Sequence, residues 1–428
     1  MMPAKIEGQG TMDRDILETL FREAVAAAQP ERAVQAHLPA RPRGRTIVIG
    51  AGKASAQMAR AFERAWDGPL TGLVVTRYGY AVPCERIEIV EASHPVPDAA
   101  GFLAARRIME KVSGLSHDDL VVALISGGGS ALLPQPAPGL TFEDEQAVNQ
   151  LLLASGAPIS VMNVIRNELS AIKGGRLAAM AAPARVATLV VSDIPGDDPA
   201  LVASGPTVPM SSTRTEARHL VALYGLDLPP AVSELLASDR NPAPKPSDPH
   251  FAHNTVSVIA SAGISLEAAA ERGRQMGLIP AILSDAVEGE AREVAKVHAA
   301  LAREVRRRNR PFQRPALLLS GGETTVTLRG RGRGGRNAEF LLAFAIAIEG
   351  SMGITALAAD TDGIDGAGDN AGAVADGTTA TRMREAGIDP LAALADNDAY
   401  NAFRAVGGLF VTGPTGTNVN DFRAIIVR

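Results

Sequence analysis

TIVIGAGKAS, residues 46–55, joins a short apolar run to a glycine-rich loop, and this order decides the fold class. The run TIVIG predicts a buried strand, and the residues from about 53 to 65 predict a helix directly after it. The same order recurs at LVVALISGGGS (120–130) and again at VATLVVSD (186–193). Short β-branched runs that alternate with Ala- and Leu-rich helices indicate an α/β protein with sheets between layers of helices.

Composition supports this class and excludes several others. Hydrophobic residues make up 46% of the chain and charged residues 21%, which is typical of a globular protein. The net charge of −5 gives no basic field, so we expect no nucleic-acid partner. The single cysteine, Cys84, excludes an intramolecular disulfide and a Cys-based zinc cluster. We find no signal-peptide pattern and no apolar run long enough for a bilayer, so we expect a cytoplasmic protein without membrane contact.

The length of 428 residues predicts roughly two or three domains. A polar stretch with four prolines, SDRNPAPKPSDPHF, predicts a linker at about 237–250. We therefore expect a first domain over residues 1–240 and a second over residues 250–428. Both are expected to be doubly wound α/β/α domains with an interdomain cleft. The closing run at 422–428 is compatible with pairing in either domain.

The loop GAGKAS, residues 50–55, is neither a Walker A loop nor a complete dinucleotide fingerprint. Ile47 stands where a Walker A loop has its first glycine, and Ser55 stands where the dinucleotide fingerprint has its third. Lys53 lies near the predicted start of a helix, where the helix dipole disfavours a cation by up to ~1 kcal/mol. A bound anion would reverse that effect, which suggests a phosphate site. The alternative is a solvated lysine on a tight turn.

The loop SGGGS, residues 126–130, is a stronger signal for phosphate. Three consecutive glycines after a buried strand allow several backbone N–H groups to converge on one anion. A sharp turn would require fewer glycines, although that alternative stays open. We expect the phosphate to contact Gly127, Gly128, Gly129 and Ser130.

Two further segments carry candidate substrate and metal residues. Arg166 and Lys173 are seven positions apart, so on one helix they would share a face that is either solvated or bound to a substrate anion. Ser192 and Asp193 follow a predicted strand, at the end where α/β proteins bind ligands. The Asp193 carboxylate could hold Mg²⁺ or accept a hydroxyl proton, whereas a role in turn formation is the simpler alternative.

The second half repeats these signals. PALLLSGGETTVTL (315–328) predicts a strand pair or hairpin that contains the string SGGETT (320–325). RGRGRGGRN (329–337) follows it, and Arg336 precedes a predicted helix, where its planar fork suits phosphate. The loop at 358–376 is rich in aspartate and could bind Mg²⁺ or substrate hydroxyls, with Asp360 and Asp362 as candidate ligands.

The histidines give no catalytic pattern from spacing. His94 and His253 are the two in suggestive contexts, and we interpret both as ordinary loop histidines.

Eight strings, in order from about residue 46 onward, together resemble the class II glycerate kinases, or glycerate 2-kinases. They are GAGKAS, SHPVPD, SGGGSALL, IRNELSAIKGGRLA, SDIPGDDPALVASGPT, SGGETTVTLRGRGRGGRN, ADTDGIDG and TGPTGTNVND. The resemblance implies a Rossmann-like first domain and a second domain of the MOFRL type. It also implies phosphoryl transfer from ATP to the 2-hydroxyl of D-glycerate, with Mg²⁺ or another divalent cation.

The resemblance also assigns residues. The lysine, arginine and aspartate of the family strings fall on Lys53, Arg336 and Asp193, for which it implies catalytic roles. Candidate substrate contacts are Arg166, Lys173 and Ser192. The expected phosphate and nucleotide contacts are Gly127, Gly128, Gly129, Ser130, Gly321, Gly322, Glu323, Gly335 and Asn337. Ala338 and Asn167 depart from the family pattern, at positions where glutamine and a basic residue are expected.

Two other functions compete with the kinase. The incomplete fingerprint at 50–55 and Arg77 after the next predicted strand are compatible with an NAD(P)H-dependent hydroxypyruvate reductase. A sensor that binds a nucleotide or sugar phosphate without turnover is the second alternative. For the kinase we expect a monomer or homodimer whose partners are ATP and D-glycerate.

Overall fold

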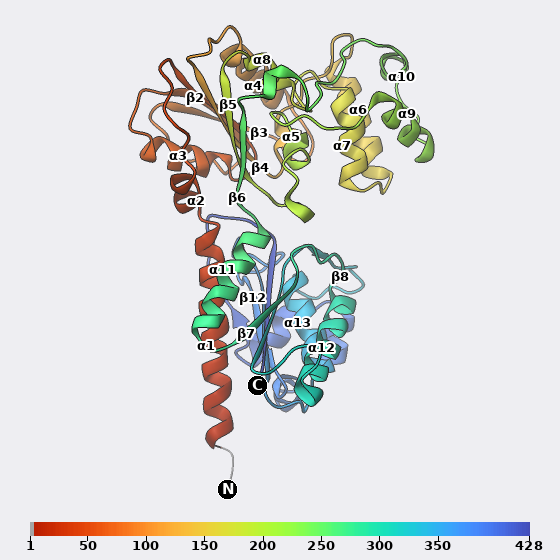
Figure 1. Ribbon diagram of the computed structural model, residues 1–428. Helices are drawn as coiled ribbons and strands as arrows, with labels where there is room; N and C mark the ends of the chain where they lie inside the picture. Colours follow the sequence, from red (N-terminus) through yellow and green to blue (C-terminus); the bar gives the residue numbers. More distant parts are fainter. Residues whose placement is uncertain (1–3) are drawn as a thin grey trace. The chain divides into compact units, whose positions relative to one another are not determined.

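The computed structural model describes residues 4–428 and divides the chain into two compact domains (Figure 1). The first domain is Pro30–Ile259. The second domain combines the residues up to Gln29 with Ala260–Arg428. None of the described helices is both long enough and apolar enough to span a membrane.

The sheet of the first domain has the strand order β3-β2-β1-β4-β5-β6. β1 pairs in parallel with β2 and β4, β2 with β3, and β4 with β5. The strands are β1 (Thr46–Ala51), β2 (Thr71–Arg77), β3 (Ile87–Ala92), β4 (Leu120–Ser126), β5 (Arg185–Val191) and β6 (Thr255–Ala260). This is the order of the doubly wound dinucleotide-binding fold, in which ligands bind where the order reverses, here between β1 and β4.

Helices cover this sheet because their apolar residues recur at helical spacing. In α3, Met58, Ala59 and Phe62 are buried and lie on one face. The helices α6, α7, α9 and α10 contribute to a separate apolar cluster, beside the main core. The helices are α2 (Pro30–Ala36), α3 (Ser55–Ala65), α4 (Ala99–Val112), α5 (Gly129–Leu132), α6 (Phe142–Ala154), α7 (Ile159–Glu168), α8 (Arg176–Ala181), α9 (Arg214–Leu223) and α10 (Pro230–Ala237). Short 3-10 turns lie at Pro195–Asp197, Val202–Ser204 and Pro249–Phe251.

The second sheet has the order β13-β12-β11-β14-β9-β7 and differs from a doubly wound sheet in strand direction. β7 and β9 are parallel, whereas the other pairings are antiparallel. The strands are β7 (Ile279–Ser284), β9 (Ala316–Ser320), β11 (Ile354–Asp360), β12 (Gly372–Asp376), β13 (Leu409–Phe410) and β14 (Asp421–Val427). The closing strand β14 therefore pairs inside the second domain, between β11 and β9.

Helices pack on both faces of the second sheet, so the expected α/β/α layering holds in this domain as well (Figure 1). α12 and α13 cover one face, and α1 and α11 cover the other. The helices are α1 (Ala4–Ala27), α11 (Ala262–Gln275), α12 (Ala291–Arg308), α13 (Arg336–Ala347), α14 (Thr379–Glu385), α15 (Pro390–Ala395) and α16 (Ala399–Ala405). The short strands β8 (Gly289–Glu290) and β10 (Thr324–Thr325) pair with each other, so β9 and β10 do not form the expected strand pair.

The domain boundaries differ from those expected in two ways. Residues up to Gln29 belong to the second domain, because Leu17, Leu20 and Phe21 of α1 are buried against its sheet. The expected linker at 237–250 lies inside the first domain, because the chain continues into β6, which is part of the first sheet, before the division after Ile259.

Candidate active site

The loops at the carboxyl ends of β1 and β4 are joined by hydrogen bonds. The backbone N–H of Lys53 donates to the carbonyl of Gly127 over 2.9 Å. The N–H of Ala54 donates to Oγ of Ser126 over 3.0 Å, and the buried Ser55 hydroxyl lies 3.1 Å from the same oxygen. Lys53 and the glycine loop are thus held together where the strand order reverses, which is the place where open α/β sheets bind ligands.

Asp193 lies beside this loop because Gly127 has no side chain. A Cβ at Gly127 would lie 1.7 Å from Oδ2 of Asp193. Gly129 has a packing role, since a Cβ there would approach the carbonyl of Ala51 to 2.7 Å. Gly128 adopts a φ of +80°, which favours glycine. The three glycines therefore serve close packing and chain reversal as well as leaving backbone close to any ligand.

The hydroxyls near the loop have protein partners. Ser130 Oγ lies 2.9 Å from Ser204 Oγ, and Ser204 donates to Oδ1 of Asn163 over 2.7 Å. Ser204 has a φ of +58°, a left-handed conformation that costs a non-glycine residue roughly 1–3 kcal/mol. Ser192, expected to contact substrate, is buried, and its hydroxyl closes a turn with Ile194.

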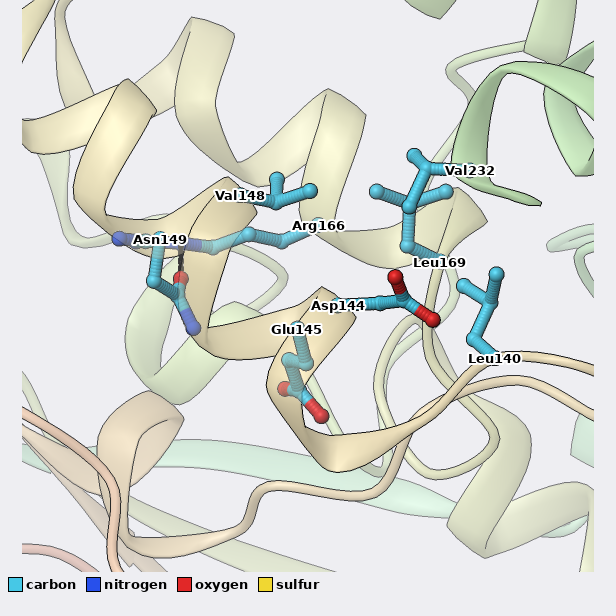
Figure 2. A pocket seen from close by; sticks show the side chains of 8 residues that line it. All are labelled: Leu140, Asp144, Glu145, Val148, Asn149, Arg166, Leu169 and Val232. Atoms are coloured by element: carbon cyan, nitrogen blue, oxygen red, sulfur yellow. Dashed lines mark hydrogen bonds between the residues drawn. The ribbon is translucent and has the colours of Figure 1, made fainter. Parts of the chain in front are cut away.

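Arg166 and Lys173 extend toward α6 rather than sharing a helix face. α7 ends at Glu168, so Lys173 lies beyond it and the expectation of one shared helix was wrong. Lys173 Nζ pairs with Glu145 over 2.7 Å, and only 1% of Lys173 is exposed. Arg166 Nε donates to Oδ1 of Asn149 over 2.9 Å in a pocket between α6 and α7 (Figure 2). The free space of this pocket is about that of one water molecule.

The second domain gathers its candidate residues around Arg336 at the start of α13. Its Nε donates to Oδ1 of Asp421 over 2.7 Å, and its Nη2 to Oδ2 of Asp360 over 2.6 Å. Its Nη1 lies 3.4 Å from Oε1 of Glu323. Burial by itself would lower the pKa of Arg336, but Asp421 and Asp360 outweigh burial and raise that pKa.

Asp421 and Arg423 form a buried pair beneath Arg336. Arg423 Nη2 donates to Oδ2 of Asp421 over 2.5 Å, and both side chains are 0% exposed. Oδ1 of Asp421 also accepts from Nδ2 of Asn337 over 2.8 Å. Asn337, expected to bind nucleotide, is itself fully buried in this network. Asp421 was not identified as a site residue from the sequence, although its string was recognised.

Asp365 caps the start of α13. Its two carboxylate oxygens accept from the backbone N–H of Asn337 over 3.0 Å and of Ala338 over 2.8 Å. The approach requires Gly335, because a Cβ there would lie 2.3 Å from Oδ1 of Asp365. The helix start is therefore occupied by a carboxylate of the protein.

The backbone N–H groups of the arginine-rich loop before α13 also donate to side chains of the protein. The N–H groups of Arg329 and Gly330 donate to Oδ1 of Asn397 over 2.7 and 3.1 Å. Those of Arg331 and Arg333 donate to Asp396 and Asp398. The glycines at 330 and 332 allow this contact, since a Cβ at either position would come within 2.4 Å of the 396–398 segment. Backbone packing thus accounts for these glycines.

The other expected contacts in this domain are also set by packing. A Cβ at Gly322 would lie 2.2 Å from the backbone N of Val287. Asp360 accepts from the N–H of Asp362 over 3.0 Å, and Asp362 accepts from the N–H of Ile364 over 2.8 Å. In residues 4–428 no three His, Cys, Asp or Glu side chains are grouped as a metal site would require.

The buried carboxyl group of Asp365 should make the stability of the second domain depend on pH. Burial raises the pKa of Asp365 to about 6, although the N–H groups of Asn337 and Ala338 oppose this. The pKa in the unfolded chain is about 3.9, so the folded state binds the proton more tightly. The contribution to stability is therefore fully present below about pH 4 and is lost as pH rises toward about 6.

We expect Asp365→Asn to remove this dependence. Between about pH 3 and 7, the free energy of unfolding of the variant should rise relative to wild type by ~3 kcal/mol, for a shift of about two pKa units. Loss of one cap hydrogen bond would add a constant offset without changing the slope. Hydrogen exchange of α13 amides at several pH values measures the difference, and a difference that does not vary with pH would contradict the expectation.

His94, which we interpreted from the sequence as an ordinary loop histidine, also lies at the glycine loop. A Cβ at Gly128 would lie 3.0 Å from Nε2 of His94 and 3.2 Å from Cε of Lys53. His94 follows β3, and the order β3-β2-β1-β4 brings that strand's end to the same edge of the sheet as the glycine loop. The string SHPVPD was the signal that could have indicated it.

The strand order of the first domain, with a lysine and an aspartate held at its glycine loop, is typical of α/β domains that bind phosphorylated ligands. A family model described as "Domain of unknown function (DUF4147)" matches residues 16–237, and the MOFRL family model matches residues 316–421. A D-glycerate 2-kinase of Thermotoga maritima is 39% identical, covering 94% of this chain and 95% of its own. The chain belongs to the glycerate 2-kinase family.

Two more comparisons bear on the activity. The crystal structure of a glycerate kinase from Thermotoga maritima matches with a TM-score of 0.89 at 37% identity, covering 98% of this chain and 100% of that chain. A relative from Agrobacterium vitis, 54% identical over 97% of this chain and 94% of its own, carries the provisional name hydroxypyruvate reductase. The names of these relatives therefore divide between a kinase and a reductase.

Proposed function

We propose that this protein transfers the γ-phosphoryl group of ATP to the 2-hydroxyl of D-glycerate, giving 2-phosphoglycerate. The observation that carries the proposal is the joining of Lys53, Asp193 and the 127–129 glycine loop where the strand order reverses. Phosphoryl transfer requires positioning and charge neutralisation more than covalent chemistry, and these groups supply both. Lys53 would neutralise charge on the transferred phosphoryl group, and the loop would hold phosphate oxygens.

Mg²⁺ fits the first domain better than the second. Kinases usually hold Mg²⁺ with one or two carboxylates and the phosphates of the substrate, and Asp193 lies directly over the glycine loop. Asp360 already accepts from Arg336 and Asp362 through its two oxygens. We therefore assign the metal to Asp193 in place of Asp360 and Asp362. The bound ion would neutralise phosphate charge during transfer.

The remaining candidates divide between ligand contact and support. We retain Arg336 as a proposed catalytic residue, because 24% of its side chain is exposed above its carboxylate partners. Glu323, with 58% of its side chain exposed, and the 321–322 glycines are proposed to adjoin the nucleotide. Asn337 and Gly335 would act by holding α13 in place. Arg166 stays a proposed substrate contact, whereas the internal ion pair of Lys173 supports a structural role.

We expect purified protein supplied with ATP, Mg²⁺ and D-glycerate to form 2-phosphoglycerate, because the loop residues are suited to phosphate. Phosphorus NMR of the product reports both the transfer and the position phosphorylated. The control is a parallel assay with hydroxypyruvate and NADPH, in which we expect no oxidation of NADPH. NADPH oxidation without phosphoglycerate would overturn the kinase proposal, and ATP binding without turnover would favour the sensor.

The reductase is the weaker alternative on structural grounds. Ser55 stands where the dinucleotide fingerprint has its third glycine, and its side chain is buried against Ser126 at the start of α3.

The cytoplasmic location and the monomeric or dimeric state of this protein stay predictions. Sedimentation of the purified protein would determine the oligomeric state.

A further inference from the structure

His94 lies beside the glycine loop. Among the described residues, neither ring nitrogen of His94 has a hydrogen-bond partner. The ring is half-buried, with Nε2 3.0 Å from the position of a Cβ at Gly128. The Lys53 side chain approaches the same position. A ligand held by the glycine loop would therefore meet an imidazole whose nitrogens are free to bond it.

Burial and the neighbouring cations keep the His94 ring neutral. Burial is the largest cause, and together with the cations Lys53 and Arg77 it lowers the pKa of His94 to about 4. Asp193 lies over the neighbouring Gly127, and Asp98, four residues after His94, accepts from Tyr78 and Gly101. A neutral imidazole has one nitrogen that accepts a hydrogen bond and one that donates. The ring is thus unprotonated at neutral pH, as a general base has to be.

We propose that His94 accepts the proton of the acceptor hydroxyl during phosphoryl transfer. The inference rests on the proposed function, because it requires a hydroxyl substrate at the glycine loop. The 2-oxygen of glycerate forms a bond to the γ-phosphorus, and its proton passes to a ring nitrogen of His94. The bond from the γ-phosphorus to the bridging oxygen breaks, and ADP leaves with that electron pair. The imidazolium then returns the proton to solvent.

Binding of nucleotide improves His94 as a base. Phosphates placed beside Lys53 would offset the positive charge that disfavours the imidazolium, so the proton affinity of the ring would rise in the complex. A group whose pKa approaches the working pH is the more effective base.

His94→Gln tests the proposal, because glutamine keeps a polar side chain but cannot accept the proton. We expect kcat to fall by about 10²–10⁴-fold, with KM for ATP and for glycerate within about threefold of wild type. In the wild-type protein, kcat should fall at acidic pH because His94 becomes protonated, and this fall should be absent in His94→Gln. The control is His253→Gln, at an exposed histidine, which should retain wild-type kcat. The melting temperature of each variant reports whether it is folded.

Other results would contradict either the role of His94 or the kinase activity itself. A kcat within about threefold of wild type, or a rise in KM alone, would overturn the role of His94 while leaving the kinase in place. Retention of the fall at acidic pH in His94→Gln, with its loss in Asp193→Asn, would assign the proton to Asp193. Absence of phosphoglycerate with the wild-type protein would overturn the proposed function and this inference with it.

A second measurement does not depend on turnover. The His94 ring can be titrated by NMR in the wild-type protein, assigned by comparison with His94→Gln. A non-hydrolysable ATP analogue with Mg²⁺ should raise the pKa of this ring by at least one unit. An unchanged or lower pKa in the complex would contradict the proposal, and if the His94→Gln variant did not fold, through-bond correlation from the backbone to the ring would assign His94 in the wild-type protein.

Discussion

Lys53→Met is expected to lower kcat for phosphoryl transfer by about 10²–10³-fold, the loss typical of removing one preorganised group that stabilises the transition state. The backbone of Lys53 is fixed by its N–H bond to Gly127, so methionine should keep the loop in place. Methionine also retains the aliphatic stem that lies against Gly128 and removes only the charge. Steady-state kinetics at saturating ATP and glycerate measure the effect.

Lys296→Met is the matched control for this change. Lys296 is exposed on α12 and pairs with Glu293 in a solvated ion pair, so its loss should leave kcat unchanged. A Lys53→Met variant with kcat close to wild type would show that the lysine is a solvated turn residue. A change confined to KM would instead assign it to ground-state binding of a substrate anion.

Asp421→Ala is expected to destabilise the second domain by about 3–5 kcal/mol. The change would leave the Arg423 guanidinium, which is 0% exposed, without its carboxylate partner. It would also remove the bonds from Arg336 and Asn337 at the start of α13. Breaking a buried ion pair by removing one partner leaves an uncompensated charge, which costs more than the pair contributed. Amide hydrogen exchange of β11 and β14 should accelerate by about 100-fold or more.

The first domain provides an internal reference for this experiment. The single tryptophan, Trp66, lies in the first domain, so its fluorescence should show an unchanged unfolding transition. Glu385→Ala, at an exposed residue of α14, should alter stability by no more than about 0.5 kcal/mol. Exchange rates in Asp421→Ala equal to those of Glu385→Ala would show that the buried pair contributes little to this domain.

Much of the first domain could be predicted from the sequence, because its signals are local. Buried strands such as β1 and β4 are continuous apolar runs, and each is followed by glycines that mark a sharp turn. Lys53 and Asp193 lie directly after strands, and parallel strands bring their carboxyl ends to one edge of a sheet. The sequence alone therefore suffices to predict that the glycine loop at 127–129 and these two residues lie close together, as they do.

The second domain was harder to predict, because its contacts join residues far apart in the chain. The glycines at 330, 332 and 335 resemble an anion-binding loop, yet they pack against Asp396, Asp398 and Asp365. Likewise, Lys173 is neutralised by Glu145 from another helix. Local periodicity does not encode which distant side chain will satisfy a given amide or charge.

The sequence by itself determined the α/β class and the strand-to-helix loops, because hydrophobic spacing and glycine placement act over a few residues. Only the tertiary structure decided that α1 joins the second domain and that β14 pairs between β11 and β9. It also placed His94 beside Lys53 and Asp421 beneath Arg336. These contacts depend on strand order, which is selected by the burial of whole faces rather than by any one segment.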